Sequence, residues 1–433
     1  MKGFERPLIK TLIPGKKSLN LSKKLQNLEC RNITFVAEDY PVFLEKSYMM
    51  NVWDVDGNRF VDLTSFFGVS FIGHNHPIVQ KCLKSPDLIN GLGDVLPSES
   101  KVTLLEELND FAGGGYRGIL GQNGADAVEA AIKTAFLYTG KPGIIAFEGG
   151  YHGLSFGALM TTYNSKFRDP FSVYLPAHTE YFSFPDGGEG SEMILEQIDK
   201  YMKMKDNVGL VLMELIQARG GVRIFPAEFV KGIAEICRKY RVVLAFDEIY
   251  TGLGRCGKPF CFEYYGVIPD ILILGKALSS SFPISVMMGK EKIMEAWPTS
   301  TGEAIHTSTF LGHPLISKIA FEVVKYIRRN RLWENASEMG EYILKKLIPL
   351  REKYQNLVKD IRGKGLLIGI EIEGASVFDI SRELLKRGYI TLSSGLRGEV
   401  LELTPPVAIT KKIVDEFVLV FEDVLKLWTS TRR

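Results

Sequence analysis

Four uninterrupted apolar segments of strand length constrain the fold of this chain more than any other feature. They are Ile144–Phe147, Val208–Met213, Val242–Phe246 and Ile271–Leu274. Amphipathic segments such as Glu228–Tyr240 lie between them and are expected to be helical. A strand that is apolar on both faces must be covered on both faces, which is typical of a parallel sheet packed between helices. We therefore predict an α/β fold whose sheet is mostly parallel.

Two further segments have clear local signals. Residues 48–63 alternate apolar and polar side chains around Asp56-Gly57, which predicts a β-hairpin. Residues 123–139 are expected to form a helix, because Asn123 can cap its start and Gly140 can end it. Local structure is therefore well specified on both sides of the first apolar segment.

The pattern of the sequence changes after Pro314. A mostly helical stretch follows, then short strand candidates and a closing helix at 411–427. We predict a smaller C-terminal α/β domain and an N-terminal hairpin that joins it. The expected parts are 1–65 for the N-terminal arm and hairpin, 66–314 for the large domain, and 315–433 for the small domain.

Composition argues against several classes of function. The chain of 433 residues is 45% hydrophobic with a formal net charge of +2, which does not suit a dedicated nucleic-acid surface. The basic stretch 1–24 has no continuous apolar segment, so we expect neither a signal peptide nor a membrane anchor. Five scattered cysteines without a CxxC pair suit a reducing, cytoplasmic location and give no metal site. His74 and His76 lie in an expected turn and lack a third ligand, so no metal is expected there either.

Three glycines imitate a dinucleotide-binding fingerprint. Gly252, Gly254 and Gly257 have the spacing G-x-G-x-x-G after an apolar strand. That fingerprint needs its first glycine directly after the strand and its last at a helix start. Here five residues intervene after the strand, and Lys258-Pro259 predicts a turn after the last glycine. A nucleotide-binding oxidoreductase is therefore a weaker interpretation.

The polar residues at the strand ends offer different chemistry. Asp247 ends one buried strand, and Gly275-Lys276 follows the next. A partly desolvated lysine is neutral often enough to attack an aldehyde. A nearby carboxylate favours a protonated pyridine nitrogen, which makes such a ring an electron sink. Tyr250 could donate a hydrogen bond to the phenolic oxygen of the ring.

At this point a family resemblance becomes visible. The segment FDEIYTGLGRCGKPFCFEYYGVIPDILILGKAL resembles the active-site signature of the class III pyridoxal-phosphate aminotransferases, such as ornithine, acetylornithine and 4-aminobutyrate aminotransferases. The resemblance extends from VWDVDGNRFVDL and GHNHP to RGKGLLIGIE and LTPPVAIT, and so covers nearly the whole chain. It implies a pyridoxal 5′-phosphate enzyme of the fold type I transferases. By this resemblance Lys276 is expected to form the Schiff base (the internal aldimine) with the cofactor. Asp247 is expected to pair with the pyridine nitrogen.

The implied reaction moves an amino group from an amino acid, ω-amino acid or amine donor to an oxo acid or aldehyde. Racemisation or epimerisation of an amino acid on the same scaffold is the alternative, and the sequence does not decide between them. A non-catalytic binding protein that kept the fold is a further interpretation, and the presence of Lys276 and Asp247 argues against it.

The resemblance also implies the residues around the cofactor. GQNGADAVEAAIK matches the phosphate-binding helix start, with Asn123, Gly124 and Ala125 at the phosphate. GGYHG places the Tyr151 ring on the pyridine face, with His152 beside it. The other implied cofactor residues are the supporting glutamate of MELIQ, a tyrosine where class III enzymes usually have glutamine, and two residues of HTSTFLGHP: Glu214, Tyr250, Ser308 and Thr309. In the family this threonine reaches the phosphate of the neighbouring subunit, which implies a homodimer.

The expected substrate residues depart from the family pattern. Arg219 stands where many members have a glutamate, and Glu402 stands where they have the arginine that binds the substrate α-carboxylate. We expect a reversed ion pair at the substrate entrance, with Arg397 as a further candidate for carboxylate binding, although a coincidental double change stays possible. Phe67 replaces a small or aliphatic residue, which suits an apolar or bulky amine as well as an ω-amino acid. Use of glutamate and 2-oxoglutarate is therefore open.

Overall fold

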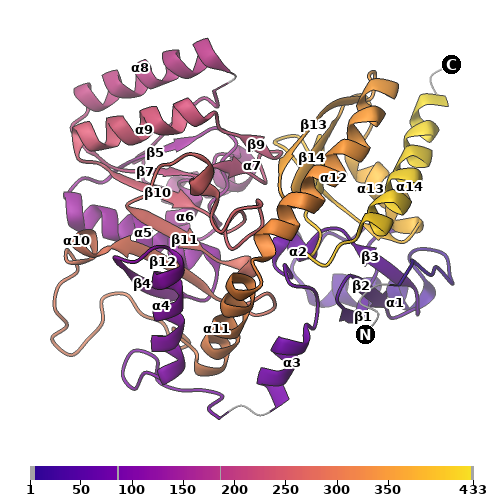
Figure 1. Ribbon diagram of the computed structural model, residues 1–433, viewed down its shortest axis with the longest axis horizontal. Helices are drawn as coiled ribbons and strands as arrows, with labels where there is room; N and C mark the ends of the chain where they lie inside the picture. The colour runs from indigo at the N-terminus through magenta and orange to yellow at the C-terminus, as the bar shows by residue number, and fades with distance from the viewer. Residues whose placement is uncertain (1–4, 85–86, 186, 431–433) are drawn as a thin grey trace. The chain divides into compact units, whose positions relative to one another are not determined.

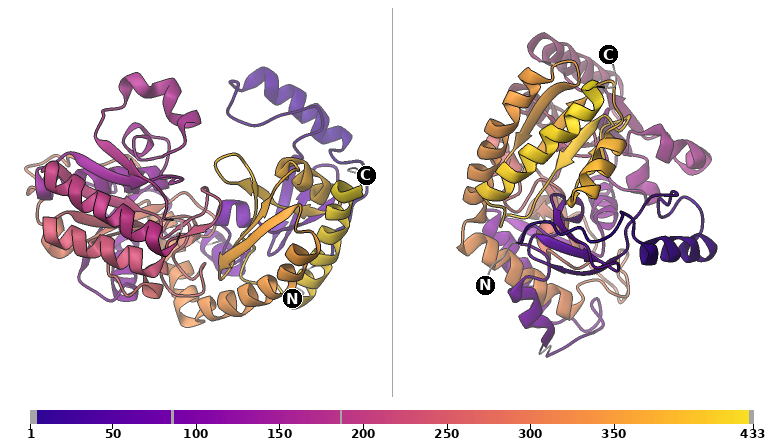
Figure 2. Two further views of the ribbon diagram at one scale, coloured as in Figure 1. Left: turned by 90° about the horizontal axis from the view of Figure 1, so that it is seen from above. Right: turned by 90° about the vertical axis from the view of Figure 1, so that its right-hand side faces the viewer.

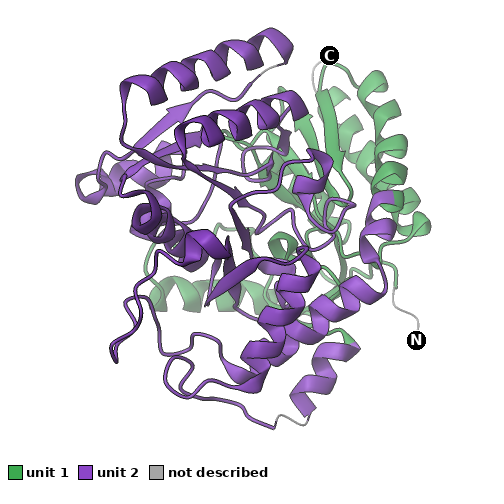
Figure 3. Ribbon diagram, turned by 60° about the vertical axis from the view of Figure 1, so that its left-hand side comes forward, with its two compact units in different colours: residues 1–76, 338–433 green, residues 77–337 purple. Residues whose placement is uncertain are grey.

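The computed structural model describes residues 5–84, 87–185 and 187–430, and the chain divides into two compact units (Figure 3). Unit 1 combines residues 1–76 with 338–433, and unit 2 is residues 77–337. The first unit thus brings the N-terminal hairpin together with the C-terminal part of the chain. The segment 315–337, which follows the sequence-based boundary, is grouped with unit 2.

Unit 2 contains a seven-stranded sheet in the order β4-β12-β11-β10-β7-β5-β6. All neighbouring pairs are parallel except those of β12, which runs antiparallel to both β11 and β4. The predicted α/β class and mostly parallel sheet are therefore confirmed. In sheet order the strands are β4 Tyr116–Gly121, β12 Ser285–Lys290, β11 Ile271–Leu274, β10 Val243–Asp247, β7 Val208–Met213, β5 Gly143–Phe147 and β6 Thr179–Phe182.

Helices cover both faces of this sheet, as its apolar strands require (Figure 1). Helix α5, Gly124–Thr139, packs on the face formed by alternate strand residues such as Leu210, Leu212 and Ile273. Phe147 points to the opposite face and contacts Phe229 of α9 at 5.7 Å between ring centroids. The other helices of the unit are α3 Pro77–Lys84, α4 Glu99–Phe111, α6 Phe156–Leu159, α7 Ser165–Arg168, η1 Asp169–Tyr174, α8 Gly188–Met204, α9 Ala227–Tyr240, η2 Cys261–Tyr264, η3 Lys276–Leu278, α10 Glu291–Met294 and α11 Pro314–Arg329; a short ribbon joins β8 Ile216–Gln217 and β9 Arg223–Ile224.

The ends of α5 show why this segment is helical. The Asn123 side chain accepts a hydrogen bond from the Asp126 backbone N–H, and the Asp126 side chain binds back to the cap, which forms a capping box. Gly140 ends the helix with φ of 68°, a conformation that glycine adopts without steric cost. Both expected signals are confirmed.

Unit 1 contains two four-stranded sheets, in the orders β13-β14-β17-β16 and β1-β2-β3-β15. The second sheet confirms the N-terminal hairpin, and β15 from the C-terminal part adds to it in parallel. Helix α13 contacts β16 and β17 and packs beside α14 (Figure 2). The elements are β1 Leu44–Tyr48, β2 Asn51–Asp54, β3 Arg59–Asp62, β13 Val358–Lys364, β14 Leu367–Ile372, β15 Tyr389–Ile390, β16 Leu392–Ser394, β17 Val400–Leu403, α1 Lys16–Leu28, α2 Ser65–Gly68, α13 Val377–Lys386 and α14 Lys411–Ser430. Helix α12, Leu332–Lys353, begins in unit 2 and continues into unit 1 from Glu338 onward.

Strand β13 has no counterpart in the sequence-based prediction. Its residues, VKDIRGK, are mostly polar, and it lies at the edge of its sheet with one partner, β14. An edge strand can carry charged side chains because one of its sides faces no other strand. The apolar pattern that revealed the central strands is therefore absent.

In the described part of the chain, no helix is both long enough and apolar enough to cross a bilayer.

Candidate active site

The two expected catalytic residues and three of the expected cofactor residues follow four adjacent strands of the large sheet. Lys276 comes after β11, Asp247 ends β10, Glu214 follows β7, and Tyr151 with His152 follows β5. These strands are mutually parallel, so their carboxyl ends share one edge of the sheet. Ligands of open α/β sheets bind at this edge. The fold thus gathers at one place residues that are up to 125 positions apart, from Tyr151 to Lys276.

Asp247 forms a buried pair with His152. Its Oδ2 lies 2.8 Å from Nδ1 of the imidazole, and both side chains are shielded from solvent. Burial by itself would lower the pKa of His152, but the hydrogen bond and negative charge of Asp247 raise it above its usual value. The other carboxylate oxygen of Asp247 accepts a hydrogen bond from the backbone N–H of Ile249. The carboxylate is therefore held in a fixed orientation.

Glu214 lies behind the Tyr151 segment. Its Oε1 accepts a hydrogen bond of 2.9 Å from the backbone N–H of Tyr151, which orients the Gly-Gly-Tyr-His turn. Burial raises the pKa of Glu214 to about 7, with His152 opposing the rise and Asp247 adding to it. Lys276 also acts on this carboxyl group and lowers its pKa. Three ionisable side chains thus influence Glu214 from three neighbouring strand ends.

Lys276 begins the short helix η3 in an unusual backbone conformation. Its φ is +42°, a backbone angle that residues other than glycine rarely adopt and that costs about 1–2 kcal/mol. Its Nζ lies 4.2 Å from the centroid of the Tyr250 ring. Strained backbone at one lysine, next to buried ionisable groups, is a local feature of functional sites.

The start of α5 lies close to the same strand ends. A Cβ atom on Gly124 would come within 2.8 Å of Ile249 Cδ1, and one on Gly275 would come within 3.2 Å of Ile249 Cγ2. Ile249 therefore separates the helix start from the residue before Lys276 by the width of one side chain. Ser285 Oγ fixes the loop by donating to the Asn123 carbonyl. The N–H groups of a helix start suit a phosphate, so an amine, a buried carboxylate and a phosphate cradle fit pyridoxal phosphate as a donor set.

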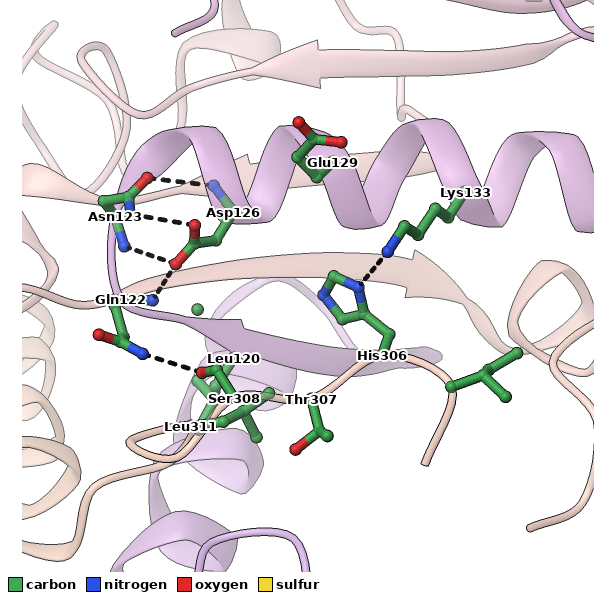
Figure 4. Close-up of a pocket in the computed structure, with 12 residues that line it drawn as sticks. Leu120, Gln122, Asn123, Asp126, Glu129, Lys133, His306, Thr307, Ser308 and Leu311 are labelled. Atoms are coloured by element: carbon green, nitrogen blue, oxygen red, sulfur yellow. Dashed lines mark hydrogen bonds between the residues drawn. The ribbon is translucent and has the colours of Figure 1, made fainter. Parts of the chain in front are cut away.

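A cavity of about 390 Å³ runs along one side of α5 (Figure 4). Gln122 Nε2 donates to Ser308 Oγ at 2.9 Å, and Lys133 Nζ lies 3.1 Å from His306 Nδ1. Ser308 is thus brought to the phosphate motif within the same chain, whereas Thr309 is exposed in the following turn. Of the described residues, those that line this cavity include Asn123 and Ser308 of the expected cofactor residues but neither Lys276 nor Asp247.

The glycine motif forms a turn. Gly254 and Gly257 have φ of 96° and 87°, and the Gly254 N–H donates to the Pro259 carbonyl. The next helix, η2, begins only at Cys261. Without a helix start at the third glycine, this segment lacks the phosphate site of a dinucleotide-binding motif. The expected turn is confirmed.

The expected substrate residues are divided between the two units. In unit 2, the guanidinium of Arg219 lies 5.6 Å from the centroid of the Tyr151 ring. In unit 1, Glu402 is 2% exposed on β17, while Phe67 is 45% exposed. Arg397 lies in the turn before β17, where its backbone N–H donates to Glu399. The Arg219–Glu402 pair therefore stays a prediction.

Phe67 belongs to a left-handed turn in which Ser65 and Phe66 also have positive φ. The turn is tied to the strand β17 region, because Ser65 Oγ donates to the Thr404 carbonyl. Thr404 Oγ1 in turn donates to the carbonyl of Thr64. An aromatic side chain is thus presented on strained but firmly anchored backbone.

Three polar residues that the sequence analysis did not single out support the site. Thr162 Oγ1 accepts from the backbone N–H of His152. Glu129 caps the segment after the Tyr151 turn by accepting from Ser155, Gly157 and Ala158. Glu248 accepts from the N–H groups of Cys261 and Phe262 and so anchors the glycine turn. Their roles depend on tertiary contacts, and only the position of Glu248 beside Asp247 could have drawn attention to one of them.

Known proteins are similar to this chain over most of its length. The family model for class III aminotransferases matches residues 35–425. The acetylornithine aminotransferase of Methanosarcina acetivorans is 34% identical over 386 residues, which cover 88% of this chain and 91% of the relative. The [LysW]-aminoadipate semialdehyde/glutamate semialdehyde transaminase of Sulfolobus acidocaldarius is 31% identical over 87% of this chain and 93% of its own.

A solved structure shows the same fold. The ornithine aminotransferase of Toxoplasma gondii ME49 superimposes with a TM-score of 0.86 at 26% identity, and the match covers 97% of each chain. A second structure of the Toxoplasma gondii enzyme contains pyridoxal phosphate at partial occupancy in its active site.

Proposed function

The chain belongs to the class III aminotransferases, and from that premise we propose that the strand-end residues around Lys276 and Asp247 carry its reaction. It is a pyridoxal-phosphate-dependent enzyme of fold type I that transfers an amino group from an amine donor to a carbonyl acceptor. The observation that best supports the proposed residues is their position at the carboxyl ends of four adjacent strands, with Asp247 paired to His152.

Each proposed residue has a separate task. Pyridoxal phosphate, when bound, supplies an electron sink for negative charge at the substrate carbon. Lys276 would bind the cofactor aldehyde and move a proton to and from the substrate carbon. Asp247, fixed by His152, would favour a positive charge at the pyridine nitrogen. The backbone N–H groups of Gly124 and Ala125 would hold the phosphate, and the Tyr151 ring would stack on the pyridine.

Replacement of the lysine tests this proposal. Lys276→Ala should lose the visible absorbance of bound pyridoxal phosphate and at least about a thousandfold in transamination rate, because the nucleophile and the proton carrier are one residue. Lys203→Ala, which changes an exposed lysine of α8, should keep both signals. Unchanged absorbance and activity in Lys276→Ala would show that another residue binds the cofactor.

The substrate is best sought among the compounds named for the relatives. We propose N-acetylornithine and ornithine as the first donors to test, since relatives over nearly the whole chain are named for them. Each donor is incubated with the enzyme in the absence of an oxo acid. Loss of the visible band together with release of a carbonyl product is the expected result. Loss of optical activity without a carbonyl product would instead indicate racemisation.

We further propose that Arg219 and Glu402 form a reversed ion pair at the substrate entrance. Both positions exchange charge relative to the family pattern, and two matching changes of opposite sign favour a pair over two independent changes. Arg219→Glu and Glu402→Arg should each lower kcat/KM about 10- to 100-fold for a carboxylate-bearing donor, and the double variant should regain part of the loss. Strictly additive losses would count against the pair.

A homodimer with a cytoplasmic location completes the proposal. Thr309, expected to reach the neighbouring phosphate, is exposed on its own chain, and the five cysteines, all within the described residues, form no disulfide. Sedimentation of the purified protein tests the dimer. Mixing Lys276→Ala with Thr309→Ala chains tests the shared site, because one of the two sites in a hybrid would be intact. Recovery of activity beyond that of either variant alone is the expected result.

A further inference from the structure

The aromatic ring of Tyr250 faces the amine of Lys276. Lys276 Nζ lies 4.2 Å from the ring centroid, which is well within the range of a cation–π interaction. Both residues follow neighbouring parallel strands, β10 and β11, so the fold itself sets this approach. The geometry concerns the face of the ring, whereas the role expected for Tyr250 from the sequence is a hydrogen bond donated by its hydroxyl group.

The surroundings make this contact stronger than the same contact at a surface. Tyr250 is 6% exposed, and Gly275 beside Lys276 packs against Ile249 with almost no free space. A cation over an aromatic ring gains most where water does not compete for the charge. The pair Lys239–Tyr240, with 5.0 Å from amine to ring centroid and an exposed lysine, gives an internal comparison in the same unit.

We propose that the face of the Tyr250 ring, and not its hydroxyl group, stabilises the protonated amine of Lys276 whenever that amine is not covalently bound. The ring then acts as a resting place for the charged lysine, both before cofactor capture and whenever the substrate has displaced the lysine. Tyr250 is therefore a positioning residue that adjusts how readily Lys276 gives up its proton. The contact between the ring and the ammonium does not depend on the proposed role of Lys276. Only its effect on the reaction rests on that proposed function.

Other charged groups also act on Lys276. Glu214 interacts with it electrostatically from the end of β7, and Asp247, paired with His152, occupies the end of β10. Ionised Glu214 favours the ammonium form, and Glu214 and Asp247 are both retained in every variant at position 250. A change in the proton affinity of Lys276 among those variants therefore reports on the side chain at that position.

Three substitutions separate the ring from the hydroxyl. Tyr250→Phe keeps the ring and removes the hydroxyl. Tyr250→Gln removes the ring and introduces the residue type usual in this family, and Tyr250→Leu removes the ring without adding a polar group. The full-length protein, freed of cofactor, is labelled briefly with acetic anhydride at a series of pH values. The extent of labelling at Lys276 is measured by mass spectrometry of its peptide.

The wild type and Tyr250→Phe should share one midpoint for labelling. Tyr250→Gln and Tyr250→Leu should both label at lower pH, with a shift of about one pH unit, which is roughly tenfold in proton affinity. Tyr240→Gln removes the ring that faces the exposed lysine and should leave the labelling of Lys276 unchanged. Return of the visible absorbance when pyridoxal phosphate is added back shows that each variant has a folded site.

Two results would overturn the inference. A shift in Tyr250→Phe as large as that in Tyr250→Gln would assign the effect to the hydroxyl group. Equal midpoints in all variants would show that the ring does not stabilise the ammonium. Failure of the proposed function is distinguishable from both, because it appears as retained visible absorbance in Lys276→Ala and leaves the labelling result valid.

Discussion

Two buried Asp–His pairs occur among the residues that the structure describes, one in each unit, with almost the same distance between their polar atoms. In unit 2, Asp247 Oδ2 lies 2.8 Å from His152 Nδ1, and in unit 1, Asp62 Oδ2 lies 2.7 Å from His74 Nε2. All four side chains are buried, and each aspartate lies at the end of a strand. The pairs therefore differ in their surroundings rather than in their own chemistry.

The surroundings of the unit 1 pair are those of a structural anchor. Thr64 donates to Asp62 Oδ1 from both its backbone N–H and its hydroxyl group, and the Phe66 ring lies 4.3 Å from the His74 ring. The pair thus holds the start of the left-handed turn that carries Phe67. The Thr64 contacts fix the backbone at the start of this turn.

The surroundings of the unit 2 pair include other ionisable groups. Glu214 interacts electrostatically with His152, Asp247 and Lys276, and Tyr250 faces the lysine amine. Charge on any of these groups changes the protonation of the others. A buried Asp–His pair is therefore a candidate for catalysis when ionisable groups surround it. Without such neighbours it has a structural role.

The largest expected difference comes from neutralising each aspartate. Asp247→Asn should lower kcat about 10²- to 10⁴-fold, because the charge opposite the pyridine nitrogen is lost. Asp62→Asn should keep kcat per folded molecule within about threefold but lose about 2–3 kcal/mol of unfolding free energy, since charge-assisted hydrogen bonds are lost. Steady-state kinetics and urea denaturation measure the two quantities. Equal loss of activity in both variants, at a temperature where both are folded, would contradict the difference in role between the two pairs.

Glu214 gives a pH-dependent test of the unit 2 pair. Its pKa is raised from the ordinary value of 4.5 to about 7 in the folded protein. Between these two pH values the folded state keeps a proton on Glu214 that the unfolded state has released. Wild-type stability should therefore fall as the pH rises from about 4.5 to 7, by no more than about 3 kcal/mol from this group. Glu214→Gln should lessen that fall, because its side chain has no proton to lose.

Urea denaturation midpoints at pH 5 and pH 8 measure this effect. Burial also raises the pKa of Glu248, to about 8, but that contribution is common to wild type and variant. Glu196→Gln, an exposed change on α8, serves as the control and should reproduce the wild-type pH dependence. Identical pH dependence in Glu214→Gln and wild type would show that Glu214 is already ionised below pH 5.

The threonines beside the two pairs give the smallest expected effects. Thr162→Val removes the acceptor for the His152 N–H, and Thr64→Val removes the hydroxyl bound to Asp62. Each should lose about 1–2 kcal/mol of unfolding free energy, because a buried polar group loses its partner. Only Thr162→Val should also lower kcat, by a few fold. A matching loss of kcat in Thr64→Val would remove the functional distinction between the pairs.

Much of the fold follows from local sequence signals. The four apolar strands, the hairpin and the helix from Gly124 to Thr139 were predictable because burial and capping leave a pattern in consecutive residues. The edge strand β13 was not predictable, because its exposed edge tolerates polar residues. Asp247 and Lys276 could be expected at one sheet edge, since each follows a buried parallel strand.

The sequence by itself determined the strand–helix alternation, the positions of the polar residues after each strand, and the family to which these patterns belong. Only the tertiary structure decided which of those residues meet. The strand order β10-β7-β5 brings His152 to Asp247 across 95 residues of sequence, and a closely similar pair at Asp62 and His74 serves a different purpose. The physical reason is that the spacing of apolar and polar residues along a chain specifies local secondary structure, and with it the end of a strand at which a residue lies. The protonation and role of a side chain depend on the charges, rings and hydrogen bonds that reach it from elements distant in sequence.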